Sequence, residues 1–132
     1  MNKYDPARVV ASLRDLAERT GGPEGSRRLC WTPDWVAARN LLRESLSTLP
    51  VDIEVDEAGN LWAYLRGESP DTLVVGSHLD SVPKGGWLDG ALGVMAGLEL
   101  LRALADEYAG SRPPITVALV DWADEEGARF SR

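Results

Sequence analysis

The stretch TLVVGSHLDSVPKGGWLDGALGVMAGLELL, residues 72–101, decides the fold. It opens with a short run of apolar and β-branched residues, which is typical of a strand buried on both faces of a sheet. From Ala91 onward the apolar residues recur at helical spacing, so we expect a strand, a loop and a helix in that order. A second β-branched run, ITVALVD (115–121), predicts another strand. A unit of strand, helix and strand favours a parallel crossover.

The part of the chain before this unit predicts three further elements. Capping residues followed by proline mark helix starts, and alternating apolar residues on both sides of a turn mark a β-hairpin. These patterns predict a helix from Pro6 to Gly21, a helix from Pro33 to Pro50 and a hairpin of residues 51–55 and 61–65. We therefore expect an α/β fold in which helices pack on a mixed, mainly parallel sheet within one domain, residues 1–132.

The composition narrows the class of protein. The chain has 132 residues, of which 44% are hydrophobic, and 21 acidic against 14 basic side chains give a net charge of −7. This charge disfavours nucleic acid and anionic membranes as partners. The longest apolar runs are far too short for a membrane span, and the single cysteine, Cys30, excludes an internal disulfide. We expect a cytoplasmic protein with an inert thiol.

Five polar residues are predicted to gather at one edge of the sheet. His78, the only histidine, and Asp80 end the first strand, Asp89 lies in the loop before the helix, and Glu125 and Glu126 follow the last strand. Sites in open α/β sheets lie beyond the carboxyl ends of the strands. Residues two apart in an extended segment point the same way, so Asp80 can orient the ring of His78.

Imidazole combined with carboxylates is a ligand set for Zn²⁺, Mn²⁺, Co²⁺ or Ni²⁺. A carboxylate between two such ions would form a two-metal hydrolase site, in which one glutamate of a Glu-Glu pair ligates and the other takes a proton from water. On this hypothesis Asp89→Ala abolishes metal binding, whereas Asp121→Ala barely changes it.

Each of these residues also has an ordinary structural interpretation. A lone histidine at a strand end is more often a hydrogen-bonded structural residue than a ligand. Asp89 is a candidate N-cap for the following helix, and the acidic run at 124–126 is typical of a solvated turn. Only their conjunction at one sheet edge favours a metal site.

Two motifs carry a resemblance to a known family. GSHLDSVPKGGWLDGALGVMAGLELL (76–101) and VDWADEEGARF (120–130) resemble the amidase, hydantoinase and carbamoylase branch of the metal-dependent aminoacylase/carboxypeptidase superfamily. VDEAGNLWAYLRG (55–67) also fits this pattern. The nearest members by this resemblance are N-carbamoyl-L-amino acid hydrolases and allantoate amidohydrolases.

The resemblance implies roles for the five residues. His78 is then a ligand of one metal ion, Asp89 bridges two divalent ions, Glu126 is a ligand of the second, Glu125 is the general base and Asp80 orients His78. The implied reaction is hydrolysis of a ureido C–N bond in a small molecule, an N-carbamoyl amino acid or an allantoate-like compound. The chain would be the N-terminal segment of a zinc-peptidase-like catalytic domain.

The resemblance also implies parts that this sequence does not contain. Family members carry further histidine ligands downstream, and an inserted domain through which they form homodimers. Two alternatives therefore stay open: an aminoacylase or dipeptidase of the same superfamily, and a noncatalytic remnant that acts as an interaction module. Gly90 in LDGALG favours the carbamoylase side.

Overall fold

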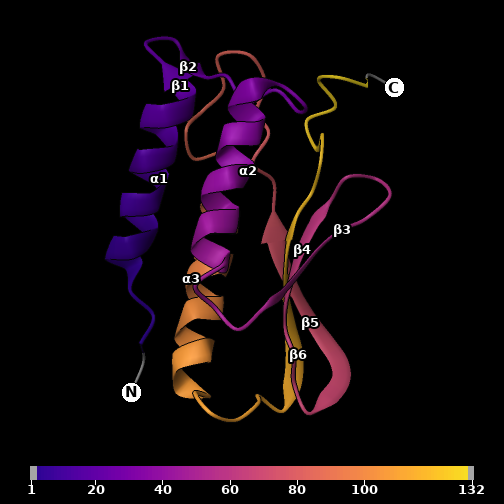
Figure 1. Cartoon of the computed structure of the whole chain (residues 1–132). Coiled ribbons are helices and arrows are strands. Elements are labelled where there is room, and N and C mark those ends of the chain that lie inside the picture. The colour runs from indigo at the N-terminus through magenta and orange to yellow at the C-terminus, as the bar shows by residue number, and fades with distance from the viewer. Residues whose placement is uncertain (1–2, 131–132) are drawn as a thin grey trace.

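The computed structural model describes residues 3–130. Three helices, four strands of a main sheet and a pair of two-residue strands make up the fold (Figure 1). In chain order they are α1 (Pro6–Thr20), β1 (Gly21–Gly22), β2 (Gly25–Ser26), α2 (Pro33–Leu46), β3 (Asp52–Val55), β4 (Leu61–Leu65), β5 (Ser69–Ser77), α3 (Ala91–Glu107) and β6 (Ile115–Asp121). The predicted α/β class and all of the predicted helices and strands are confirmed, although α2 ends at Leu46 rather than at Pro50. Only the short pair β1 and β2 was not foreseen.

The main sheet is mixed, with strand order β3-β4-β6-β5. β5 and β6 are parallel neighbours on either side of α3 in the sequence, which confirms the crossover. The expectation of a mainly parallel sheet is wrong for these four strands, because β3 pairs with β4 and β4 with β6 in antiparallel fashion. The reason is that the hairpin of β3 and β4 extends the sheet of the crossover, since β4 pairs with β6.

β5 also departs from expectation. The run was predicted to be buried on both faces, yet Leu73 is 50% and Val74 48% exposed. β5 is an edge strand with β6 as its one partner among the described strands, whereas β6 lies between two strands and is buried from Thr116 to Asp121. Sheet position, rather than composition, decides which apolar strand is covered.

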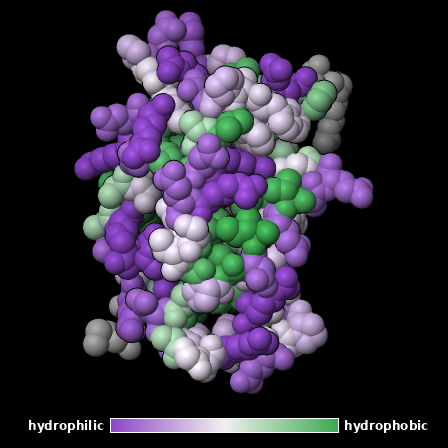
Figure 2. Space-filling view, viewed as in Figure 1, coloured by the Kyte–Doolittle hydropathy of each residue, from purple (hydrophilic) through white to green (hydrophobic). Residues whose placement is uncertain are grey.

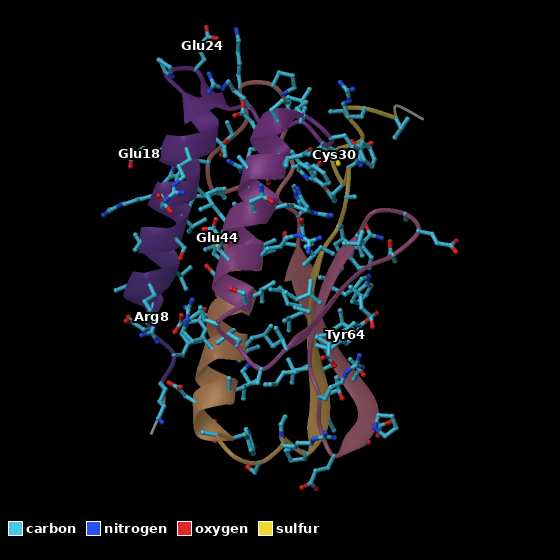
Figure 3. All side chains as sticks on the ribbon, in the orientation of Figure 1. Arg8, Glu18, Glu24, Cys30, Glu44 and Tyr64 are labelled. Atoms are coloured by element: carbon cyan, nitrogen blue, oxygen red, sulfur yellow. The ribbon has the colours of Figure 1, made fainter. Side chains whose placement is uncertain are left out.

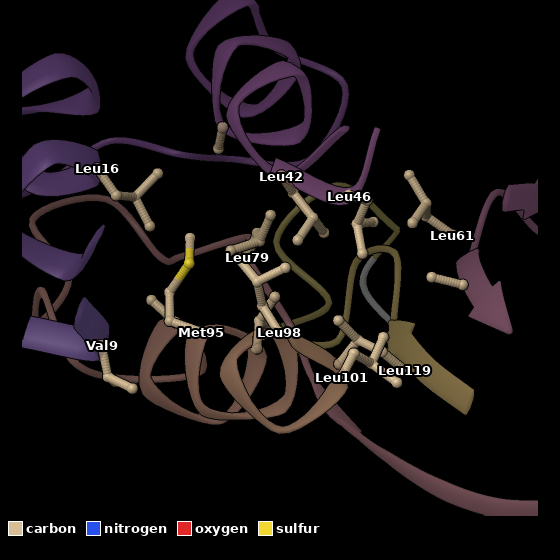
Figure 4. Packing of buried hydrophobic residues seen from close by; sticks show 14 of the residues in the cluster. Val9, Leu16, Leu42, Leu46, Leu61, Leu79, Met95, Leu98, Leu101 and Leu119 are labelled. Atoms are coloured by element: carbon tan, nitrogen blue, oxygen red, sulfur yellow. The ribbon is translucent and has the colours of Figure 1, made fainter. Parts of the chain in front are cut away.

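The helices lie together on one face of the sheet (Figure 1). α3 contacts β5 and β6, and α1 and α2 contact each other and α3. The core between helices and sheet is built mainly from leucines, among them Leu16, Leu42, Leu61, Leu98 and Leu119 (Figure 4). Burial of these side chains is the main term that stabilises the fold.

Two local features fix the helices in place. The Asp5 side chain accepts a hydrogen bond of 2.9 Å from the N–H of Ala7 and so caps α1 as predicted. In α3, a Cβ added at Gly93 would lie 2.6 Å from the Cβ of Ser77, so glycine lets α3 approach the end of β5 closely. Ser77 directly precedes His78, and this close contact therefore sets the position of the predicted site.

The surface seen in Figure 2 is largely hydrophilic, with a patch of hydrophobic residues near its middle. Across residues 3–130, helices of the length and apolar character needed to cross a bilayer are absent.

Candidate metal centre

The site lies where β5 and β6 end. Ser77 and Asp121, the last residues of the two strands, are paired in the register, and the N–H of Trp122 donates to the carbonyl oxygen of Ser77 over 2.9 Å. The segment from 78 to 90 follows β5 and the segment from 122 to 130 follows β6. Because the strands are parallel, both segments leave the sheet at the same edge.

Three side chains from these segments converge. His78, Asp89 and Glu126 each offer one potential ligand atom, and these atoms lie within 4.8 Å of one another. His78 is buried, Glu126 is half-buried and Asp89 is exposed. These are the three residues that sequence analysis expects to be metal ligands, and their spacing fits a single divalent ion held by one nitrogen and two oxygens.

The ring of His78 is oriented by Asp80. Nδ1 lies 2.9 Å from the carbonyl oxygen of Asp80 and 3.3 Å from its carboxylate Oδ1. The hydrogen bond to the Asp80 carboxylate raises the pKa of His78 to about 9, against the opposing effect of burial. With Nδ1 bound to Asp80, Nε2 is the ring atom that faces Asp89 at 4.0 Å and Glu125 at 3.2 Å. A metal ion bound there would take the place of the Nε2 proton.

The Asp80 carboxylate has a second structural role, which was not predicted from the sequence. Its fully buried carboxylate accepts hydrogen bonds from the backbone N–H groups of Glu125 at 3.3 Å and Glu126 at 3.1 Å. One carboxylate therefore connects His78 on the β5 side with the glutamate pair on the β6 side. This bridge fixes the distance between the two halves of the site.

Asp89 and Glu126 are close enough to interact directly. A hydrogen bond to Asp89 is the main cause that raises the pKa of Glu126, followed by burial and by the negative charge of Asp89. Their potential ligand atoms lie within 4.8 Å of each other. Two carboxylates this close repel each other unless a proton or a cation lies between them. The pair is therefore suited to a shared cation, which supports the fit of a divalent ion.

Glu125 is placed differently from Glu126. Its side chain is 50% exposed and does not belong to the group of three, although its Oε2 lies 3.2 Å from Nε2 of His78. The carboxylate thus stands beside the cluster and remains open to solvent. This is a suitable position for a group that exchanges protons with water.

The structure excludes one of the ordinary structural interpretations, in which Asp89 is the N-cap of the following helix. The N-cap of α3 is Gly90, and the helix start has no side-chain cap, so the carboxylate of Asp89 does not cap α3. Gly90 has a φ of +69°, and a Cβ there would lie 2.5 Å from Cε1 of His78. The packing role of Gly90 was not predicted from the sequence, although the Asp89-Gly90 pair was a signal for it.

A cavity of about 640 Å³ opens beside the cluster. Glu125 and Glu126 form part of its wall. Another part of the wall is formed by Trp31 and Phe130, whose rings pack edge to face with their centroids 5.1 Å apart. Trp31 was not singled out by sequence analysis. The cavity gives a small organic molecule access to the glutamate pair.

Comparisons with known proteins agree with the fold. The chain is 39% identical over 126 residues to an N-carbamoyl-L-amino acid amidohydrolase of Geobacillus stearothermophilus, covering 93% of this chain and 30% of that protein. It is 37% identical over 108 residues to an allantoate amidohydrolase of Bacillus subtilis, covering 80% of this chain and 26% of that protein. A crystal structure of a hydantoinase/carbamoylase family amidase from Burkholderia ambifaria superposes with a TM-score of 0.89 at 39% identity, covering 98% of this chain and 32% of that one.

The chain thus shares its α/β fold with part of a hydantoinase/carbamoylase family amidase and is similar in sequence to amidohydrolases, in agreement with the resemblance. The pattern of peptidase family M28 matches residues 60–130, which include all five predicted site residues. The chain belongs to peptidase family M28. It spans between 25% and 32% of the length of the curated relatives that it matches at this level of similarity.

Proposed function

We propose that this chain forms the N-terminal part of the metal centre of an amidohydrolase that cleaves C–N bonds of ureido or amide substrates. The observation that carries the proposal is the convergence of His78, Asp89 and Glu126 within 4.8 Å, with Glu125 beside them. Relatives with amidohydrolase names align over 80% to 99% of this chain, which supports the same chemistry here.

In this proposal each side chain has one role. His78, Asp89 and Glu126 would hold the metal. A bound divalent ion, Zn²⁺ or alternatively Mn²⁺, Co²⁺ or Ni²⁺, supplies Lewis-acid polarisation of the substrate carbonyl. Glu125 takes a proton from the attacking water and returns it to the leaving nitrogen. Asp80 keeps the Nδ1 proton of His78 in place and so presents Nε2 to the site.

The proposed substrate is an N-carbamoyl amino acid or an allantoate-like ureido compound. Support comes from the names of the relatives, N-carbamoyl-L-amino acid amidohydrolase and allantoate amidohydrolase. The match to a peptidase family favours a second candidate, hydrolysis of the amide bond of an acylated amino acid or dipeptide. Both reactions would use the same five residues. A cytoplasmic location is part of the proposal, supported by the single buried thiol of Cys30.

A chimaera tests the proposal. Residues 1–132 replace the aligned N-terminal part of the Geobacillus stearothermophilus amidohydrolase, and the chimaera is loaded with Zn²⁺ or Mn²⁺. Ammonia release is measured with N-carbamoyl-L-amino acids and allantoate, and acetate release with N-acetyl amino acids. We expect ammonia from one of the two ureido substrates. Glu125→Gln in the same chimaera should reduce the rate by about 100-fold or more, as expected for loss of a general base.

Glu57→Gln is the matched control, because Glu57 is exposed in the turn between β3 and β4. It should leave the rate unchanged. A folded, metal-loaded chimaera that releases no ammonia but cleaves the N-acetyl substrate would favour the aminoacylase alternative. Equal rates for Glu125→Gln and Glu57→Gln would contradict the role given to Glu125.

A further inference from the structure

The peptide groups of Leu79, the residue between His78 and Asp80, are held by two charged side chains. The N–H of Leu79 donates to Oδ1 of Asp121 over 2.8 Å, and its carbonyl oxygen accepts from Nε of Arg28 over 2.7 Å. Asp121 and Arg28 are both completely buried. Hydrogen bonds to ionised partners are stronger and more directional than those between neutral groups, so this backbone segment is held firmly.

Asp121 is in turn fixed by α2. Its second oxygen, Oδ2, accepts from Nε of Arg39 over 2.7 Å, and the carbonyl oxygen of Asp121 accepts from Nη2 of the same residue over 3.0 Å. Arg39 also donates to the carbonyl oxygen of Gly59 over 2.6 Å, and its guanidinium group lies 4.3 Å from the centre of the Trp35 ring. These contacts fix the position of the Arg39 guanidinium group, which in turn holds the Asp121 carboxylate in place.

Arg28 connects the loop before α2 to the same segment at two points. Its side chain binds the carbonyl oxygen of Leu79 and donates to the hydroxyl groups of Thr20 and Ser26 at 3.3 and 3.1 Å. Its backbone N–H donates to the hydroxyl of Ser81 over 2.9 Å, and its carbonyl oxygen accepts from the N–H of Ser81 over 2.8 Å. Residues 79 and 81 are thus both tied to Arg28.

We propose that Asp121, Arg39 and Arg28 are positioning residues that set the orientation of His78 and Asp80 and thereby preorganise the metal centre. The proposal rests on the proposed function for its consequence, metal affinity. Both site residues flank the Leu79 peptide, so a rotation of that peptide would turn the imidazole and the Asp80 carboxylate together. Burying charged groups is costly, and here their hydrogen bonds go to the backbone between the two site residues.

This inference replaces the sequence-based expectation that Asp121→Ala barely changes metal binding. In sequence, Asp121 is only the last residue of a strand. The structure shows that its carboxylate does not point into the group of three but lies behind it, against the backbone of Leu79.

The test compares Asp121→Asn with Glu99→Gln in the 132-residue chain. The amide introduced by Asp121→Asn can still accept from Leu79 or from Arg39, but it cannot satisfy both as a carboxylate does, and it keeps the side-chain volume. Glu99 is the matched control, because it is another buried carboxylate bound by arginines, and it lies on α3 against α1 rather than at the site. Arg28→Lys is the second test variant of the three positioning residues, should Asp121→Asn not fold.

The first readout needs no metal. His78 is the only histidine, so its ring gives one set of ¹⁵N signals. We expect hydrogen exchange of the Leu79 amide to speed up by at least about tenfold in Asp121→Asn relative to neighbouring protected amides, with a change in the Nδ1 signal of His78. Glu99→Gln should alter neither. Unchanged Leu79 exchange and His78 signals in folded Asp121→Asn would overturn the proposal.

The second readout is metal binding. Calorimetric titration with Zn²⁺ should show affinity about 10- to 100-fold lower for Asp121→Asn, the range found for residues that support metal ligands, with altered visible bands of bound Co²⁺. Glu99→Gln should bind as the unmodified chain does. Equal weakening in both variants would show a general loss of stability and overturn the positioning role. A folded unmodified chain that binds no Zn²⁺ would contradict the proposed function, while the first readout would still decide whether Asp121 positions His78.

Discussion

Gly90 adopts a left-handed backbone conformation beside the ring of His78. Its φ is +69°, and an added Cβ would lie 2.3 Å from the carbonyl oxygen of His78 and 2.5 Å from Cε1 of its ring. Glycine is therefore required here for two separate reasons, backbone conformation and space. The loop that carries Asp89 can pack against His78 only because residue 90 has no side chain.

Gly90→Ala should lower the free energy of unfolding by more than the roughly 1–2 kcal/mol that a left-handed alanine costs by itself. The collision with His78 adds to this cost and should also weaken Zn²⁺ binding, since the ring must move. Urea denaturation and zinc titration measure the two effects. Gly110→Ala is the control, because Gly110 has a φ of +81° with no atom within 4 Å of the added Cβ. Equal losses in both variants, with unchanged zinc affinity, would contradict the packing role of Gly90.

Cys30 is the only thiol and is completely buried. It lies near the start of α2 and the segment that follows β6 (Figure 3). Burial raises the pKa of Cys30 to about 11. At pH 8 only about one thiol in a thousand would then be ionised, and the thiolate is the reactive form.

Iodoacetamide at pH 8 should therefore leave the folded chain unmodified for hours and modify it fully in concentrated urea. Mass spectrometry gives both results on the same sample. The urea sample is the control for reagent activity, and rapid alkylation of the folded chain would show that Cys30 is neither buried nor protonated.

At the residue scale, sequence analysis was able to place His78, Asp89 and Glu126 together because all three follow strands that a helix crossover makes parallel. It did not identify Arg28 or Arg39 as neighbours of the site. Their partners are backbone groups or residues about 50 to 80 positions away, and a lone arginine in a loop or on a helix carries no signal for such a contact.

At the scale of elements, Glu99 joins α1 to α3. Its buried carboxylate accepts hydrogen bonds from Nη2 of Arg8 at 2.7 Å, from the N–H of Asp5 at 3.0 Å and from Arg102. Burial acts to raise the pKa of Glu99, but the hydrogen bonds outweigh it and the pKa lies below its ordinary value of 4.5. Arg8, which Figure 3 labels at the start of α1, thus ties the first helix to the crossover helix.

The sign of this shift predicts a pH dependence. A carboxylate whose pKa is lowered by folding contributes stability that is fully present above its unfolded pKa, near 4.5, and is lost as pH falls through the folded pKa. Glu99→Gln should lower the free energy of unfolding at pH 7 by about 1–3 kcal/mol. The difference from the unmodified chain should shrink below pH 4.5. Thermal denaturation from pH 3 to 7 measures both, and a difference that grows on acidification would contradict this account.

The elements themselves were predictable to different degrees. α1 and α2 carry proline at their starts, and β3 and β4 alternate in polarity, so local pattern alone places them. The exposure of β5 was not predictable in the same way. Its apolar residues resemble those of β6, and only the strand order, set by the hairpin pairing with β6, leaves β5 at an edge.

At the scale of the whole molecule, the number of ligands limits the number of ions. Residues 3–130 contain one group of three potential metal ligands, and the chain spans between a quarter and a third of the length of its relatives. A two-ion centre, as the resemblance implies, therefore requires ligands from outside the group found here. β5 lies at one edge of the sheet and carries exposed apolar residues. A further strand could pair with β5 at this edge.

The 132-residue chain should accordingly bind one Zn²⁺ rather than two. Equilibration with excess Zn²⁺, removal of unbound metal and elemental analysis give the ratio directly. The His78→Ala variant, treated in parallel, controls for adventitious binding to the acidic surface. Two ions retained per chain would contradict a site limited to His78, Asp89 and Glu126.

The central claim is that these three side chains form a metal site, and calorimetric titration of Zn²⁺ into the metal-free chain tests it most directly. The control is Asp71→Ala, which removes one exposed negative charge near the opposite end of β5. The account predicts saturable binding that is lost in His78→Ala and Asp89→Ala and kept in Asp71→Ala. Binding that is equally strong in all three variants, or absent from the folded unmodified chain, would contradict it.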